Sequence, residues 1–479
     1  MIKKLFLSLV IILLLVFVFV LARTFFYSKQ IPATSAAPVP ALDSMAIKHL
    51  SDAIRIKTVS LDDDHLKDSS SFFALRSFFD STYPLVRQKL EKTIIDSFSY
   101  IYHWKGKNNQ LAPYLFLAHT DVVPVEDSSR HLWHADPFGG TIKDSAVWGR
   151  GSIDDKGSVI ALLEAVSALL KQNFQPERDI YLCFGHDEEL GGVYGAQKIV
   201  EWFKQRHVKA GLVLDEGGII TKENFKELNR PIALLGVTEK GYATFELSVE
   251  KAGGHSSMPE KETAIDIITA ALTRLKQHPT KVRFSEPTNV MLDKIGPGLN
   301  FTTRMALANR WLFEPMLVSQ FEKTKGTNAS IHTTIVPTIL SSGMKDNVIP
   351  SFAKATVNCR IMPGETSADV EAFIKNAIND ERIHLKRGQF ASEPGKQTSL
   401  ESEAYKKATA SAYKILDNVV PTPFLMIGAT DSRFYEPVTD ATIRFLPAID
   451  PQGFHGIDER LPFADLQRMI FFYKLMMRE

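Results

Sequence analysis

The sequence predicts an α/β protein with a mostly parallel sheet, interrupted by a smaller α+β domain. Short apolar runs that end in His, Asp and Glu alternate with helical patterns, which is typical of βαβ units. From about Tyr242 the pattern changes to half-exposed alternating strands. We therefore predict one domain built from residues 44–241 and 364–479, with residues 242–363 inserted into it. A length of 479 residues also favours more than one domain.

Composition limits the classes of function. Hydrophobic residues make up 44% and charged residues 23% of the chain, as in globular proteins. The net charge of +1 leaves no excess of cations to neutralise phosphates, so we expect no nucleic-acid partner. Cys183 and Cys359 each lie in an apolar, strand-like run. We expect two buried free thiols rather than a disulfide.

The amino-terminal segment differs from the rest of the chain. Lys3 and Lys4 precede an uncharged run over residues 5–22, which is at the lower end of the length of a membrane-spanning helix. No small-x-small cleavage site follows, so residues 1–28 are interpreted as a signal anchor, with a cleaved signal peptide as the alternative. Either reading puts the body of the chain outside the cytoplasm, anchored to a membrane or secreted. Residues 29–43, rich in Pro, Ala and Ser, are predicted to be a linker.

The remaining elements follow from apolar periodicity and from Gly and Pro breaks. In the first part of the chain we predict helices at 44–55, 71–79 and 194–205, and a further helix whose apolar positions run from 159 to 170. We predict strands at 93–103, 114–118, 179–184 and 211–214. In the inserted part we predict strands at 243–250 and 353–361 and a helix at 264–277. The first domain then resumes with helices at 367–379 and 401–416, a strand at 442–446 and a last helix from about 464.

Side chains of the kind that bind metals follow three of these strands and stand at the start of one helix. They are His119 and Asp121, then Asp154 and Asp155, then Glu188 and Glu189, and finally Asp215. Helix capping explains one residue of the Asp154–Asp155 pair but not both. Because the carboxyl ends of parallel strands share one edge of a sheet, we expect the whole set to converge there.

Such a cluster needs cations. Two like charges about 4 Å apart repel by roughly 4 kcal/mol at an effective dielectric constant of 20. Imidazole plus carboxylate ligands suit Zn²⁺, with Mn²⁺ or Co²⁺ as substitutes. The number of acidic side chains indicates two ions that share a carboxylate.

Six motifs, in order, identify a resemblance that covers the chain after the linker. They are His119-Thr-Asp-Val-Val-Pro124, Gly149-Arg-Gly-Ser-Ile-Asp-Asp-Lys-Gly157, His186-Asp-Glu-Glu189, Leu214-Asp-Glu-Gly-Gly218, Gly253-Gly-His-Ser-Ser-Met-Pro259 and Phe454-His-Gly456. The chain resembles the di-zinc metallopeptidases of family M20, which include aminoacylase, carboxypeptidase S and acetylornithine deacetylase. Within that family it is most similar to the branch of carboxypeptidase S and N-fatty-acyl-amino acid synthase/hydrolase. The resemblance implies a zinc-peptidase catalytic domain with an inserted lid or dimerisation domain.

The resemblance also implies a ligand set for two Zn²⁺ ions per subunit. Asp154 would bridge the ions, and His119, Glu189, Asp215 and His455 would be the other ligands. Which ligand serves which ion stays open. Without the resemblance, His455 would be interpreted as an ordinary loop histidine.

Two residues are expected to act in the chemistry beside the metal. We predict Glu188 as the general base that takes a proton from water and passes it to the leaving amine. Adjacent side chains on an extended segment point in opposite directions, so Glu189 can ligate while Glu188 faces the water. Asp121 is expected to hold His119 in its ligating tautomer.

The resemblance assigns the substrate contacts. It implies that His255 donates to the developing oxyanion and that Arg360 grips the substrate carboxylate. Asn347, Gly428 and Thr430 are further substrate-binding candidates. In relatives the histidine reaches across a homodimer interface, although here the long segment at 279–334 could alter that interface.

The leading hypothesis is a zinc-dependent hydrolase that cleaves an amide bond beside a free carboxylate. Its substrate would be a short peptide with a free carboxyl terminus or an N-acyl amino acid. The alternatives are an N-fatty-acyl amino acid hydrolase/synthase rather than a carboxypeptidase, and an inactive exported binding module. Because His119 and His455 must be neutral to bind metal, activity is expected to fall in acid.

Overall fold

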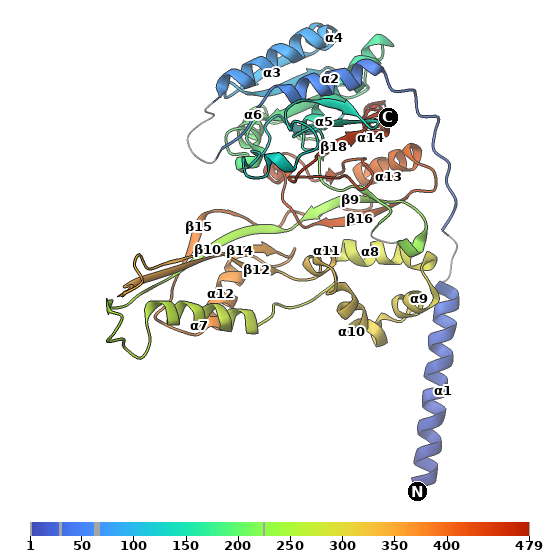
Figure 1. Ribbon diagram of the computed structural model, residues 1–479. Helices are drawn as coiled ribbons and strands as arrows, with labels where there is room; N and C mark the ends of the chain where they lie inside the picture. The colour runs from blue at the N-terminus through green and yellow to red at the C-terminus, as the bar shows by residue number, and fades with distance from the viewer. Residues whose placement is uncertain (1, 28–30, 62–67, 224–225, 479) are drawn as a thin grey trace.

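The computed structural model describes residues 2–27, 31–61, 68–223 and 226–478 (Figure 1). Residues 1 and 28 of the predicted anchor and 29–30 of the predicted linker lie outside these ranges. The helices are α1 (Ile2–Tyr27), α2 (Ser44–Arg55), α3 (Ser69–Thr82), α4 (Pro84–Lys89), α5 (Lys156–Lys171), α6 (Ala196–Gln205), α7 (Ala264–Gln277), α8 (Glu286–Ile295), α9 (Phe301–Ala308), α10 (Arg310–Phe321), α11 (Lys325–Ala329), α12 (Ser367–Ile378), α13 (Glu403–Ile415) and α14 (Phe463–Arg478). The strands are β1 (Glu91–Ile95), β2 (Ser99–Trp104), β3 (Tyr114–His119), β4 (Thr141–Lys143), β5 (Ala146–Trp148), β6 (Ile180–Gly185), β7 (Leu212–Asp215), β8 (Ile220–Thr221), β9 (Ile232–Glu239), β10 (Gly241–Glu250), β11 (Gly254–His255), β12 (Thr334–Ser342), β13 (Val348–Ile349), β14 (Phe352–Ile361), β15 (His384–Ser392), β16 (Val420–Met426), β17 (Thr442–Arg444) and β18 (Arg460–Pro462).

A nine-stranded sheet forms the centre of the larger domain, in the order β1-β2-β6-β3-β7-β17-β9-β16, with β8 paired to β9. The strands β6, β3, β7 and β17 run parallel to one another. Their residues are buried throughout, as expected for apolar strands covered on both faces. The predicted α/β fold with a mostly parallel sheet is confirmed. The single strand predicted at 93–103 is instead the hairpin β1–β2, because Asp96 and Ser97 adopt positive φ and turn the chain.

Helices cover both faces of this sheet. Buried residues of α2, α5, α13 and α14 pack on one face in the largest hydrophobic core. Helix α6 and the 3₁₀ segment η5 (Asp431–Val438) pack on the other face with Leu115, Cys183 and Val213. Cys183 and Cys359 are both buried and free, as predicted.

The smaller domain is an antiparallel sheet in the order β12-β14-β10-β15, packed against α7 and α12 (Figure 1). Its extent differs from the predicted 242–363. Strand β15 pairs with β10 up to Tyr242↔Ser392, so the chain returns to this sheet after residue 363. Helices α8 to α10 instead pack on Ile232, Leu234 and Val420 of the large sheet. The sequence near β15 does not indicate its pairing with β10, and the sequence of α8 to α10 does not indicate their packing on the large sheet.

A third, three-stranded sheet joins distant parts of the chain. Its order is β18-β5-β4, and all its pairs are antiparallel. Residue Arg460 of β18 lies opposite Trp148 of β5. The sheet therefore brings the loop that follows β5 next to the loop that precedes β18.

Helix α1 projects away from the rest of the chain (Figure 1). It is the one described helix that is long and apolar enough to cross a membrane, with a mean hydropathy of 3.4 over its central window. The segment that follows it lies against the large domain: Arg230 donates to the carbonyls of Ile31 and Pro32, and Ala37 N–H donates to Lys414 O at 2.9 Å. In its described part, the predicted linker is therefore held against the large domain by hydrogen bonds.

Candidate metal centre

Three neighbouring parallel strands bring the predicted site residues to one edge of the sheet. Strand β3 ends at His119, β6 is followed by Glu188 and Glu189, and β7 is followed by Glu216. Because the sheet order is β6-β3-β7, His119 lies between the two acidic loops. The carboxyl edge of a parallel sheet is the usual place for a ligand site in such folds.

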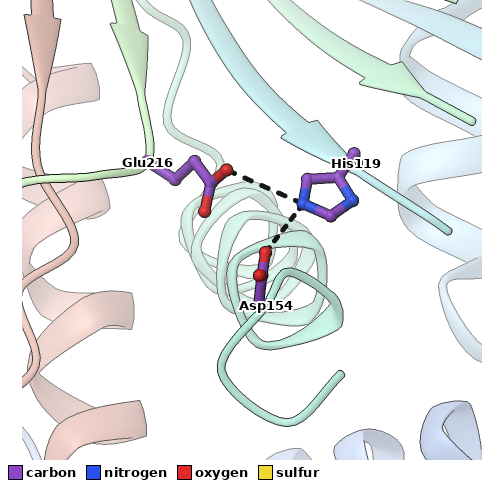
Figure 2. A group of neighbouring side chains, drawn as sticks. All are labelled: His119, Asp154 and Glu216. Carbon is purple, nitrogen blue, oxygen red and sulfur yellow. Dashed lines mark hydrogen bonds and ion pairs between the residues drawn. The ribbon is translucent and has the colours of Figure 1, made fainter. Parts of the chain in front are cut away.

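His119 is the centre of the first group of ligating atoms. Its Nε2 lies 2.9 Å from Asp154 Oδ1 and 3.7 Å from Glu216 Oε1 (Figure 2). Its Nδ1 lies 3.1 Å from Asp121 Oδ1, on the other side of the ring. This contact favours the tautomer with the proton on Nδ1, which leaves Nε2 free to ligate.

A second group shares Asp154 with the first. His455 Nε2 lies 2.6 Å from Asp154 Oδ2 and 3.3 Å from Glu189 Oε1. The two oxygens of Asp154 thus each face a different imidazole. This is the geometry required of a carboxylate that bridges two ions, which is the role predicted for Asp154.

The ligand role of Asp215 stays a prediction, and the structure brings its neighbour to this group instead. The carboxylate beside His119 and Asp154 belongs to Glu216. Asp215 Oδ2 accepts from Ser432 N–H at 2.9 Å, and Asp215 Oδ1 accepts from Glu216 N–H, so both of its oxygens bind backbone amides. The adjacent Asp-Glu pair carried the needed signal, because neighbouring side chains at a strand end face different ways.

The electrostatics of these side chains fit divalent cations. Burial and the charge of Asp154 raise the pKa of Glu216 well above its usual value. Glu189 Oε1 is buried, with His455 Nε2 at 3.3 Å as its ion-pair partner. Two imidazoles and two further carboxylates around the shared Asp154 form a donor set suited to two divalent transition-metal ions. His455, with 48% of its side chain exposed, marks the open side of the centre.

A buried ion pair that the sequence did not indicate holds the two halves of the centre together. Arg150 Nη1 lies 2.6 Å from Glu459 Oε2. The other oxygen of Glu459 accepts from the N–H groups of Ile153 and Asp154 at 2.9 and 3.2 Å. Glu459, which lies four residues after His455, thus fixes the backbone at Asp154.

Glu188 lies at the same edge, in a 3₁₀ turn (η2, Glu188–Leu190) rather than the extended segment assumed above. With three residues per turn, successive side chains diverge by about 120°, so Glu188 and Glu189 still face different ways. The Glu188 N–H donates to Asp121 Oδ1 at 3.2 Å. Burial is the main cause that raises the pKa of Glu188 to about 8.

Arg360 lies where the two domains meet. Its guanidinium stacks 4.8 Å from the centroid of the Tyr242 ring and has no ion pair with a carboxylate in the part of the chain that the structure describes. Burial lowers its pKa and the charge of Arg433 lowers it further, while the charges of Tyr242 and Glu239 raise it. Glu239, which pairs with buried Arg444 at 3.0 Å, also accepts from Thr430 N–H at 3.2 Å. Thr430 therefore ties Glu239 to the loop whose Ser432 contacts Asp215.

The other residues predicted to bind the substrate are His255, Asn347 and Gly428. None of them contacts the metal centre through a described hydrogen bond or ion pair. His255 and Asn347 lie in an exposed ribbon of the smaller domain, where His255 pairs with Val348. The His255 ring contacts Ser257, and no described hydrogen bond or ion pair joins the ribbon to the metal centre. A Cβ at Gly428 would meet no atom within 4 Å, so open space lies beside that backbone.

Comparison with known proteins identifies the family of the chain. Residues 115–479 match the model of peptidase family M20/M25/M40. The chain is 38% identical over 435 residues to a probable carboxypeptidase S-like 2 of Dictyostelium discoideum, covering 89% of this chain and 83% of that relative. It is 34% identical over 432 residues to the human N-fatty-acyl-amino acid synthase/hydrolase PM20D1, covering 88% and 85%. Its fold matches the M20 family metallo-carboxypeptidase Sso-CP2 of Sulfolobus solfataricus with a TM-score of 0.69 at 17% identity, covering 91% and 99%. The chain belongs to the peptidase family M20/M25/M40 and is an enzyme of that family of metal-dependent hydrolases.

Proposed function

We propose that the protein hydrolyses an amide bond beside a free carboxylate, using two zinc ions. The ions would be held by His119 and Glu216 on one side and by Glu189 and His455 on the other, with Asp154 shared. The observation that carries this proposal is that Asp154 presents one oxygen to each histidine. Two histidines and three carboxylates are ligands that zinc accepts.

The residues around the ions have separate tasks. When bound, the ions would polarise the amide carbonyl and acidify water. Glu188 takes a proton from the attacking water and delivers it to the leaving nitrogen. Asp121 orients the His119 ring, and the Arg360 guanidinium binds the substrate carboxylate in two-pronged fashion. Among the described residues, Arg360 forms no ion pair with a carboxylate. Its positive charge is therefore available to a ligand.

Two acyl groups are candidates for the other side of the amide. The relative named carboxypeptidase S-like 2 supports a short peptide. The relatives named N-fatty-acyl-amino acid synthase/hydrolase support a long acyl chain. Both substrate types present the same amide and carboxylate to the centre, so the centre itself accepts either.

We also propose that α1 anchors the protein in a membrane with the enzyme domain outside the cytoplasm. Its apolar run over residues 5–22 spans about 27 Å as a helix, close to the roughly 30 Å hydrocarbon thickness of a bilayer. The homodimer stays a prediction, in which the exposed His255 of one subunit would reach the centre of another. The molar mass by light scattering tests it.

The experiment that tests the function compares a dipeptide and a long-chain N-acyl amino acid as substrates, with zinc and after chelation. Hydrolysis of one of them that is lost on chelation and restored by zinc supports the proposal and selects the acyl group. Elemental analysis of the active protein should give two zinc ions per chain. Absence of hydrolysis of both substrates by a zinc-loaded protein would refute the proposal and favour an inactive binding module.

A further inference from the structure

The outer face of α10 has the polarity opposite to that of an ordinary surface helix. Its inner face buries Leu317 and Phe321 in the core shared with the large sheet. The residues on the opposite side of the helix, by the 100° step per residue, are Trp311, Leu312, Pro315, Met316 and Ser319. Trp311, Leu312 and Met316 are 55%, 44% and 47% exposed. Four apolar residues in five on an outer face indicate a surface that contacts something other than water.

The position of this face is fixed by α1. The side-chain amide of Asn309, at the corner between α9 and α10, donates to Val20 O and Thr24 Oγ1, both at 3.2 Å. Asn309, Val20 and Thr24 are buried in this contact. Because an amide buried at a helix corner binds the backbone of α1 directly, α9 and α10 cannot shift along α1 without losing these bonds.

A second contact sets the depth of Trp311. Its ring lies 6.3 Å from the ring of Phe19, measured between centroids. Phe19 is three residues inside the end of the apolar run at residue 22, which is about 4.5 Å along the helix axis. If residues 5–22 cross the hydrocarbon, Trp311 lies at its outer boundary. Trp is enriched at that level because its ring is apolar and its N–H is polar.

The neighbouring surface continues the same character. A groove of about 690 Å³ lies between the last turns of α1 and α9, and Phe25, Phe26, Phe301 and Arg304 line it. Phe25, Phe26 and Phe301 are 77%, 75% and 53% exposed. Arg304 borders this aromatic groove, where a guanidinium can reach lipid phosphates while its stem stays apolar.

We propose that α9 and α10 form a second membrane contact, which inserts Trp311, Leu312 and Met316 into the outer interface of the bilayer that holds α1. This inference rests on the proposed anchoring by α1. It goes further, because α1 alone would leave the enzyme domain free to tilt, whereas two contacts hold one face of the large domain toward the lipid. In Figure 1, α8, α9 and α10 lie on the side of the large domain from which α1 projects.

The test measures the depth of single fluorescent labels on the full chain in phosphatidylcholine vesicles. Cys183 and Cys359 are buried, so a cysteine introduced at the surface is labelled selectively. The variant Leu312→Cys carries the probe on α10. Leu13→Cys places it in the middle of α1, and Ser77→Cys on the exposed surface of α3 is the matched aqueous control. Nitroxide lipids, labelled near the glycerol or near the methyl end, quench from the bilayer, and iodide quenches from water.

We expect the Leu312→Cys probe to lose fluorescence to nitroxide near the glycerol and to be protected from iodide, whereas the Ser77→Cys probe shows the reverse. Quenching of both probes by iodide alone would overturn the proposal. Protection of the Leu312→Cys probe from both quenchers would also overturn it, since a protein surface would then cover α10. The Leu13→Cys probe separates the two proposals: if nitroxide near the methyl end quenches it while Leu312→Cys stays in water, only the second contact fails.

Discussion

Replacing Glu188 by Gln should lower activity and raise the stability of the metal-free protein at the same time. The substitution keeps the shape of the side chain and leaves the Glu188 backbone bond to Asp121 intact. It removes the group that takes the proton from water. General-base catalysis contributes about 10²–10⁴-fold, so kcat should fall by that factor, equivalent to roughly 3–5 kcal/mol of barrier.

The stability effect follows from the raised pKa of Glu188, from 4.5 to about 8, for which burial is the first cause. Between these two values the folded metal-free protein holds a proton that the unfolded chain releases, so the stability of the wild type falls as pH rises through this window. At about 1.4 kcal/mol per pH step, the loss reaches about 3 kcal/mol at pH 7. Glu188→Gln carries no such charge and should be more stable by up to that amount.

The assay pairs turnover and zinc content of the loaded enzyme with urea unfolding of the chelated protein at pH 5 and pH 7. Glu201→Gln is the matched control, since it removes an exposed carboxylate that pairs with Lys198 at 3.0 Å on α6. A surface pair of this kind is worth at most about 1 kcal/mol. A Glu188→Gln enzyme with near-normal kcat, or one that has lost its zinc, would refute the assigned role.

Four further outcomes are expected. Glu216→Gln should lose bound zinc by elemental analysis while Asp215→Asn keeps it, because only Glu216 lies beside His119. Asp121→Ala should weaken zinc binding about 10–100-fold in a competition titration, through loss of its bond to the His119 ring. Arg360→Met should raise KM for substrates with a free carboxylate but not for their amides. Burial, together with the charge of Arg360, lowers the pKa of Lys240 to about 7. Between pH 7 and 10.5 the unfolded chain therefore binds the proton more tightly than the folded protein does, and the stability of the wild type rises with pH. Against Lys240→Met, the gain from pH 7 to pH 9 in urea unfolding should be about 3 kcal/mol.

These predictions have their own control variants and contrary results. Lys354→Met changes an exposed cation on the same strand as Arg360 and should leave KM unchanged. Equal zinc loss from the Asp215 and Glu216 variants would restore Asp215 as a ligand. A difference in stability between wild type and Lys240→Met that stays constant across this pH range would show that the amine keeps its ordinary pKa. Its hydrogen bonds to two carbonyls would then offset the effect of burial.

The sequence was most informative where a local pattern sufficed. Apolar runs that end in His119 or precede Glu188 located strands β3 and β6 and the edge that carries the metal groups. The adjacent acidic pair after β7 was located too. The sequence nominated Asp215, whereas the carboxylate beside His119 is that of Glu216, since which side chain turns inward depends on the amides of Ser432 and Glu216.

What the sequence could not show depends on contacts between distant segments. Strand β15 joins the smaller sheet by pairing with β10, and nothing near residues 384–392 indicates its partner. The Arg150–Glu459 pair joins residues 309 positions apart. His455 was found only through resemblance, because an exposed loop histidine has no local mark of ligation.

The distance along the chain between Asp154 and Glu459 also sets an order of events during synthesis. The two residues are 305 positions apart, yet Glu459 fixes the backbone of Asp154 and His455 faces its side chain. At 5–20 residues per second, about 15–60 s pass between the appearance of one and of the other. Until its last residues are made, the nascent chain has Asp154 but lacks both Glu459 and His455. If the proposed metal centre forms, its completion is therefore a late step of maturation.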